Sequence, residues 1–236
     1  MRYIKISQIY VLNFFILFLI CSCDFLAPKA KKSNKIFITD ALNSINIENL
    51  LDALLYEDKK LIPVKNLSKD GQIYYSFPLL IGEKNLTYYE IENWFNKGSE
   101  FFKEDRSNIK SILIKLHKFG VNTEIIKINN GALGLWVPYE KTIFIDEKVI
   151  KMGSRFFLDV LSHESIHVAQ SCFAGSKESY PKRIGLPLDF SKKLELNLSH
   201  KFYSNNSKEE ILIEREAFTY SKVEGSAIKL LEKFCI

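Results

Sequence analysis

The chain has 236 residues, of which 47% are hydrophobic and 26% are charged, so it is long enough to bury a core and too apolar for a disordered protein. Its formal net charge of +5 is mild, and the lysines cluster only briefly, at Lys29, Lys31, Lys32 and Lys35. Because nucleic-acid binding needs a concentrated basic face, we expect no nucleic-acid partner.

Residues 1–23 have the pattern of a targeting segment. Arg2 and Lys5 precede an almost purely apolar run over 9–20, which has the length of a signal-peptide core and is short for a membrane span. The following Cys21-Ser22-Cys23 completes a stretch that resembles a bacterial lipobox, which implies cleavage before Cys23 and acylation of its sulfur. An uncleaved anchor and simple secretion are the alternatives. All three predict an extracytoplasmic domain, periplasmic or on the cell surface, and the first two attach it to the membrane.

The next region is expected to hold a tether and a helical lobe. Residues 24–36 are polar and Lys-rich, which is typical of a tether. Residues 37–120 are predicted to form a mainly helical N-terminal lobe. Its expected elements are a helix over 38–56 with Asp40 as a cap, a strand over 72–80 that Pro78 interrupts, and a helix over 87–119 with a break near 105–108.

Residues 121–236 change to a short β pattern and then return to helix. Asn129-Asn130-Gly131 is a strong turn signal and predicts a hairpin. We expect strands over 121–128, 132–137 and 141–146, helices over 156–172 and 208–234, a loop over 175–187 and a shorter helix within 188–203. This order predicts an α+β fold with a small antiparallel β-meander packed on the two long helices.

The sequence His163-Glu164-Ser165-Ile166-His167 lies in the expected helix over 156–172. Residues four apart share one helix face, so the two imidazoles can bind a single Zn²⁺. Glu164 lies beside that face and can act as general base on a metal-activated water without binding the metal itself. The flanking residues are uncharged, as suits a helix buried behind a metal.

A catalytic zinc site needs a third protein ligand. Residues 168–172 contain neither the glycine nor the histidine of the extended metzincin pattern, which excludes that clan. The stretch Glu214-Arg215-Glu216-Ala217 fits the ExxA pattern of some gluzincins, zinc peptidases with HExxH on one helix and a glutamate ligand on a later one. The chain resembles this family over 156–221 and the preceding strands, which implies Glu214 as the third zinc ligand.

Other acids remain open as the third ligand. At about 100° per residue, Glu216 points roughly 160° away from Glu214 on a helix. Glu216 is the main alternative ligand, or an acceptor for a histidine N–H. Glu178 and Glu209 are further alternatives.

The resemblance implies a zinc-dependent hydrolase, a membrane-tethered metallopeptidase that cleaves peptide or protein substrates with metal-activated water. It also implies a zincin-like core over 121–236 with an edge strand, at 132–137 or 141–146, for the substrate. Tyr220 or Tyr180 is the expected oxyanion donor, with His117 and His200 as weaker candidates. The alternative is a non-catalytic peptide-binding or structural module on the same scaffold, although such a module has no use for Glu164.

Cys172 and Cys235 are the cysteines that follow Cys23. An extracytoplasmic domain permits a disulfide, and two cysteines leave one possible pairing. This bond would join the C-terminal helix to the HExxH helix. Two buried free thiols are the alternative.

Overall fold

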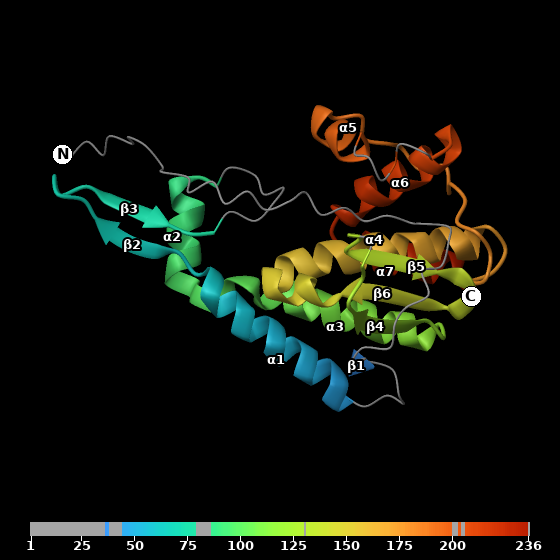
Figure 1. Ribbon diagram of the computed structural model, residues 1–236, viewed down its shortest axis with the longest axis horizontal. Coiled ribbons are helices and arrows are strands. Elements are labelled where there is room, and N and C mark those ends of the chain that lie inside the picture. The colour runs from blue at the N-terminus through green and yellow to red at the C-terminus, as the bar shows by residue number, and fades with distance from the viewer. Residues whose placement is uncertain are drawn as a thin grey trace.

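The computed structural model describes residues 36–37, 44–78, 86–129, 131–199, 203 and 206–235 (Figure 1). The predicted targeting segment 1–23 and nearly all of the tether, as well as Asp40 and His200, lie outside these residues. No helix within the described ranges is long and apolar enough to cross a membrane.

The N-terminal half consists of helices and one projecting hairpin. Its elements are β1 (Ile36–Phe37), α1 (Ser44–Leu61), β2 (Val64–Leu67), β3 (Ile73–Ser76), α2 (Tyr88–Lys97), the 3₁₀ helix η1 (Gly98–Phe102) and α3 (Lys103–Lys118). β2 and β3 form an antiparallel hairpin that extends away from the helices (Figure 1). Strand β2 was not predicted. It is short, and three of its four residues are exposed, so it lacks the alternation of buried and exposed residues that indicates a strand.

The helix predicted over 87–119 breaks earlier than expected. A capping box between Thr87 and Glu90 begins α2, and Gly98 ends it with a φ of 56°, a conformation that glycine adopts without steric cost. The break predicted at 105–108 is therefore wrong, since these residues lie in the first turns of α3.

The sheet differs from the predicted antiparallel meander. Strands β4 (Asn122–Ile126), β5 (Gly134–Val137) and β6 (Thr142–Asp146) join β1 in the order β1-β4-β6-β5. β4 pairs with β6 in parallel, and β5 pairs with β6 antiparallel, so the turn at 129–131 does not connect two paired strands and the hairpin prediction is wrong. The Asp146 carboxylate at the end of β6 accepts the Ile128 N–H at 2.8 Å, which holds the chain leaving β4 beside β6.

The C-terminal half contains the central helix of the fold. Its elements are the 3₁₀ helices η2 (Pro138–Glu140) and η3 (Glu147–Met152), then α4 (Gly153–Phe173), α5 (Lys192–Leu198), α6 (Lys208–Ser221) and α7 (Ser226–Phe234). The helix predicted over 208–234 is thus two helices, because Gly225 with a φ of 69° starts α7 in a new direction. Residues 175–187 form no helix or strand, as expected.

Helix α4 is buried along most of its length and organises the core. Every residue from Val160 to Ser171 is buried, and α4 packs against α1, α3, α6, α7 and strand β5 (Figure 1). One hydrophobic cluster joins residues of α1, α3, the sheet, α4 and α7. Buried Asp58 on α1 adds a polar link, because it accepts the Ser154 N–H at 2.8 Å and pairs with Arg106 on α3. The fold is therefore α+β, with the HExxH sequence held rigidly at its centre.

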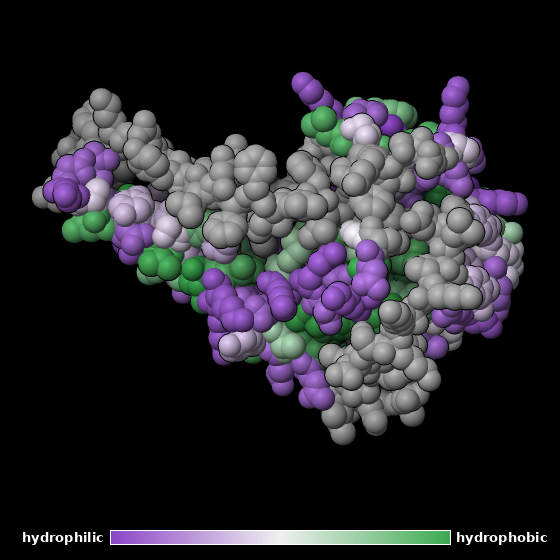
Figure 2. All heavy atoms as spheres, in the orientation of Figure 1, coloured by the Kyte–Doolittle hydropathy of each residue, from purple (hydrophilic) through white to green (hydrophobic). Residues whose placement is uncertain are grey.

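The surface is mixed in polarity, with an apolar concentration on the hairpin. Side chains from both strands, Val64, Leu67, Ile73 and Tyr74, are 47–69% exposed. Figure 2 shows hydrophobic residues reaching the surface along this end of the molecule. Hydrophilic residues cover much of the remaining described surface in this view.

A disulfide joins Cys172 at the end of α4 to Cys235 after α7, with a Cα–Cα distance of 5.1 Å. The bond closes a loop between residues 63 positions apart. By loop-closure entropy, replacing both cysteines with serine should lower the free energy of unfolding by about 4 kcal/mol. Chemical denaturation of the oxidised and double-serine proteins measures this. A double-serine protein as stable as the oxidised wild type would contradict the expectation.

Candidate metal centre

Three buried side chains from α4 and α6 converge on one point. His163 Nε2 and His167 Nε2 lie 3.0 Å apart. Glu214 Oε2 lies 3.3 Å from His163 Nε2, and Glu214 Oε1 lies 3.5 Å from His167 Nε2. An ion bound tetrahedrally at normal Zn–N and Zn–O distances separates its ligand atoms by about 3.3 Å. The described geometry therefore fits a single small metal ion, and these three residues form the one group of possible metal ligands within the described ranges.

The local sequence explains why the three residues meet. The spacing of four places both histidines on one face of α4. On α6, Ala217 lies one turn after Glu214 and is fully buried, so its small side chain allows α6 to approach α4 closely. The three ligand residues are each at most 2% exposed. The three side chains are therefore largely shielded from bulk solvent.

The charges of the triad also favour a cation. Burial alone would lower the pKa of His167, but the facing Glu214 carboxylate, together with Glu164 and Gln170, outweighs burial and raises this pKa to about 9. Burial likewise favours protonated Glu214, yet the two imidazoles reverse that effect and lower the pKa of its carboxyl group. Glu214 Oε2 is buried and has no well-oriented hydrogen-bond donor among the described residues. A metal ion would replace the proton on His167 and satisfy this oxygen.

Glu216 lies outside the triad and has a different set of partners. Its Oε2 accepts hydrogen bonds from Gln170 Nε2 and the Ile184 N–H, and its Oε1 accepts those of Gly185 and Leu186, all between 2.9 and 3.0 Å. Gln170 in turn contacts His167 Nδ1 at 2.8 Å through its Oε1. Glu216 therefore reaches a histidine N–H only through Gln170.

Gln170 was missed by the sequence analysis. A signal for it was present, because a residue three positions after His167 lies on the same helix face. The other acids considered as ligands lie elsewhere: Glu178 pairs with Lys141 at 2.5 Å, and Glu209 is exposed in the first turn of α6.

Glu164 is fully buried between α4 and the edge strand β5. A Cβ atom on Gly134 would lie 2.6 Å from Glu164 Oε1, so the carboxylate occupies the space that any side chain at this position would need. β5 itself is fixed to α4 by a buried hydrogen bond of 2.9 Å from Trp136 Nε1 to the Ser171 hydroxyl. β5 is the outer strand of the described sheet, whereas β6 lies inside it, so of the two expected segments only 132–137 holds an edge position.

Gly134→Ala should displace the Glu164 carboxylate, because buried Glu164 has little room to move away from the new methyl group. We expect the variant to lose at least about tenfold in any hydrolytic rate that depends on Glu164. Its metal content should stay normal, since Gly134 is not among the three possible metal ligands. Parallel measurement of rate and bound metal tests this. Full activity would show that the carboxylate position next to β5 is not critical.

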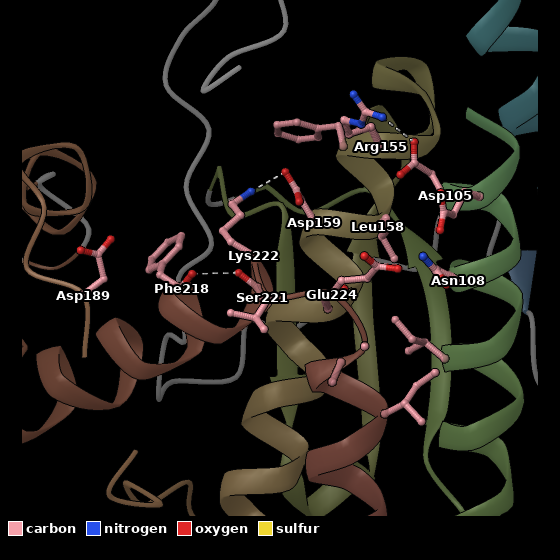
Figure 3. A pocket seen from close by; sticks show the side chains of 18 of the residues that line it. Asp105, Asn108, Arg155, Leu158, Asp159, Asp189, Phe218, Ser221, Lys222 and Glu224 are labelled. Atoms are coloured by element: carbon pink, nitrogen blue, oxygen red, sulfur yellow. Dashed lines mark hydrogen bonds and ion pairs between the residues drawn. The ribbon is translucent and has the colours of Figure 1, made fainter. Parts of the chain in front are cut away.

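A cavity of about 650 Å³ (Figure 3) reaches neighbours of the triad, although no triad residue lines it. Ser162 and Phe218 form part of its wall, and the Phe218 ring lies 4.4 Å from the His163 ring. Five acidic and two basic residues line it: Glu104, Asp105, Asp159, Asp189, Glu224, Arg155 and Lys222. Figure 3 shows the ion pairs Arg155–Asp105 and Lys222–Asp159 on this wall. The cavity is thus acidic overall although the whole chain is basic.

The expected oxyanion donors receive no direct support. Tyr220 packs against the main hydrophobic core, and Tyr180 is half exposed in the segment after α4. His117 is partly buried near the end of α3. The oxyanion role of Tyr220 or Tyr180 therefore stays a prediction.

No protein-family model, curated protein or solved structure matches this chain.

Proposed function

We propose that this protein is a zinc-dependent hydrolase, a gluzincin-like metallopeptidase with a zincin-like core that acts outside the cytoplasm. The observation that carries the proposal is the buried group of His163, His167 and Glu214, with the Glu164 carboxylate held on the same helix beside an edge strand. Two imidazoles and one carboxylate form a donor set typical of catalytic zinc. A structural zinc site generally uses four protein ligands, and the described residues supply three.

Zinc would polarise the scissile carbonyl and lower the pKa of an attacking water. Glu164 would take the proton of that water and pass it to the leaving amine. His163, His167 and Glu214 would hold the metal. β5 is the outer strand of the described sheet, and a strand in this position is suited to pair with an extended substrate segment.

The cavity beside His163 is suited to substrate side chains. Its lining carries five carboxylates and two cationic groups, and both cations already pair with acids of the same wall. Peptides with basic side chains are therefore the first substrates to assay. We further propose that the N-terminal segment holds the domain at the membrane, through an acylated Cys23 or an uncleaved anchor.

The proposal is tested by metal analysis and by hydrolysis of peptides that carry lysine or arginine. The purified protein should contain about one zinc per chain. A chelator should abolish hydrolysis, and added zinc should restore it. Protein that binds no metal would reject the metal centre. Protein that binds zinc but cleaves no peptide in a broad library would favour the non-catalytic binding module instead.

A further inference from the structure

Glu216 is a fully buried carboxylate whose oxygens accept four hydrogen bonds. Three of the donors are the successive backbone N–H groups of residues 184–186, in a segment without helix or strand. Such a segment has few internal hydrogen bonds to fix its path. Glu216 therefore determines where residues 184–186 lie against α6.

The fourth donor, Gln170, connects Glu216 to the metal centre. Gln170 Nε2 donates to the Ile213 carbonyl at 3.1 Å and to Glu216 Oε2 at 2.9 Å. With both amide hydrogens used, Gln170 Oε1 faces His167 Nδ1 at 2.8 Å and must accept its proton. When a metal is bound, this contact keeps the proton on Nδ1 and leaves the Nε2 lone pair for the ion.

The segment that Glu216 holds continues into the cavity wall. Asp189 N–H donates to the Thr219 hydroxyl at 3.1 Å, and Arg215 Nη1 donates to the Asp189 carbonyl at 3.1 Å. Asp189 lines the cavity, where Figure 3 shows it on the side of Phe218. Helix α6 thus supplies the third metal ligand and also the groups that fix this wall.

We propose that Glu216 is a positioning residue that couples the orientation of His167 to the position of residues 184–189. The inference rests on the metal site of the proposed function and adds that metal binding and this wall stabilise each other. Coupling of this kind is reciprocal: metal should hold the segment in this position, and loss of this position should weaken metal binding.

The first experiment measures zinc affinity of the full chain by competition with a chelator. Glu216→Ala should weaken zinc binding by about 10- to 100-fold, the effect usual for loss of an outer hydrogen-bond partner of a ligand histidine. Gln170→Leu should weaken it by a similar factor. The double variant should lose no more than the worse single variant, because both changes break one chain of contacts. Unchanged affinity in Glu216→Ala, or full additivity, would overturn the proposal.

The second experiment measures trypsin cleavage after Lys182 or Arg183, next to the held segment. Metal-free Glu216→Ala should be cleaved several-fold faster than wild type, whereas Gln170→Leu should not, because the three N–H bonds to Glu216 remain. Zinc should slow this cleavage in wild type, and saturating zinc should slow it less in Gln170→Leu. Cleavage at Lys65 in the β2–β3 hairpin serves as the internal control.

The two experiments separate the proposal from the metal site itself. If wild type binds no zinc, the proposed function fails, while the metal-free cleavage of Glu216→Ala still reports whether Glu216 holds the segment. If Glu216→Ala does not fold, Glu216→Gln replaces it. The glutamine amide keeps one acceptor oxygen, but its NH₂ group would face N–H groups that also donate, so part of the contact is lost. Wild-type affinity and wild-type cleavage in Glu216→Gln would reject the positioning role.

Discussion

Glu164→Gln should abolish peptide hydrolysis while leaving zinc bound. Glutamine fills the same space beneath Gly134 but cannot take a proton from the attacking water. Loss of a general base costs a rate factor of about 10² to 10⁴. The zinc content should stay at about one per chain, because Glu164 is not among the three residues whose ligand atoms converge. Steady-state kinetics and metal analysis on the same preparation measure both quantities.

The matched control is Glu178→Gln. Glu178 also lies in the C-terminal half, but it pairs with Lys141 at the surface and belongs neither to the triad nor to the cavity lining. This variant should keep full activity. Equal activity in the two glutamine variants would remove Glu164 from the mechanism.

Glu214→Ala should remove most metal binding. The variant leaves two buried imidazoles without the carboxylate that faces them at 3.3 and 3.5 Å. Loss of a residue that only hydrogen-bonds to a metal ligand weakens metal binding by up to about 100-fold. Because Glu214 would itself bind the metal, we expect the affinity for zinc to fall by more than this. Hydrolysis should disappear with the metal. Isothermal titration or chelator competition measures the affinity.

Glu209→Ala is the control for this second prediction. It lies on the same helix α6, but in its exposed first turn. Its zinc affinity should match wild type. Normal zinc binding by Glu214→Ala would show that the third ligand lies elsewhere, and the residues outside the described ranges would then be the next to replace.

The sequence could predict the parts of this site that depend on local geometry. The HExxH spacing by itself places two imidazoles on one face of α4, and the buried flank of that helix follows from its uncharged residues. The prediction of Glu214 as the third ligand came from the resemblance to gluzincins and from its position on the helix. Gln170 is different, because its role depends on Ile213 and Glu216, which approach it only after α6 has packed on α4.

The sheet shows a second limit on what the sequence can predict. The turn signal at 129–131 is local and says only that the chain changes direction. Whether the strands on either side pair depends on β6, which follows later in the sequence and inserts between them. The helix breaks at Gly98 and Gly225 are the opposite case. Both glycines were visible in the sequence; with positive φ values, Gly98 ends α2 and Gly225 begins α7.

The disulfide has a consequence for how the ligand set assembles. Cys172 ends the helix that carries both histidines, and the chain between Cys172 and Cys235 includes Glu214. Oxidation therefore confines the Glu214 carboxylate to a covalent ring attached to the imidazole helix, even when the tertiary contacts are lost. In such an unfolded chain, the effective concentration of the third ligand near the first two is raised before any metal arrives. A chain exported reduced would lack this advantage until its thiols were oxidised, so thiol oxidation should precede efficient metal capture during folding.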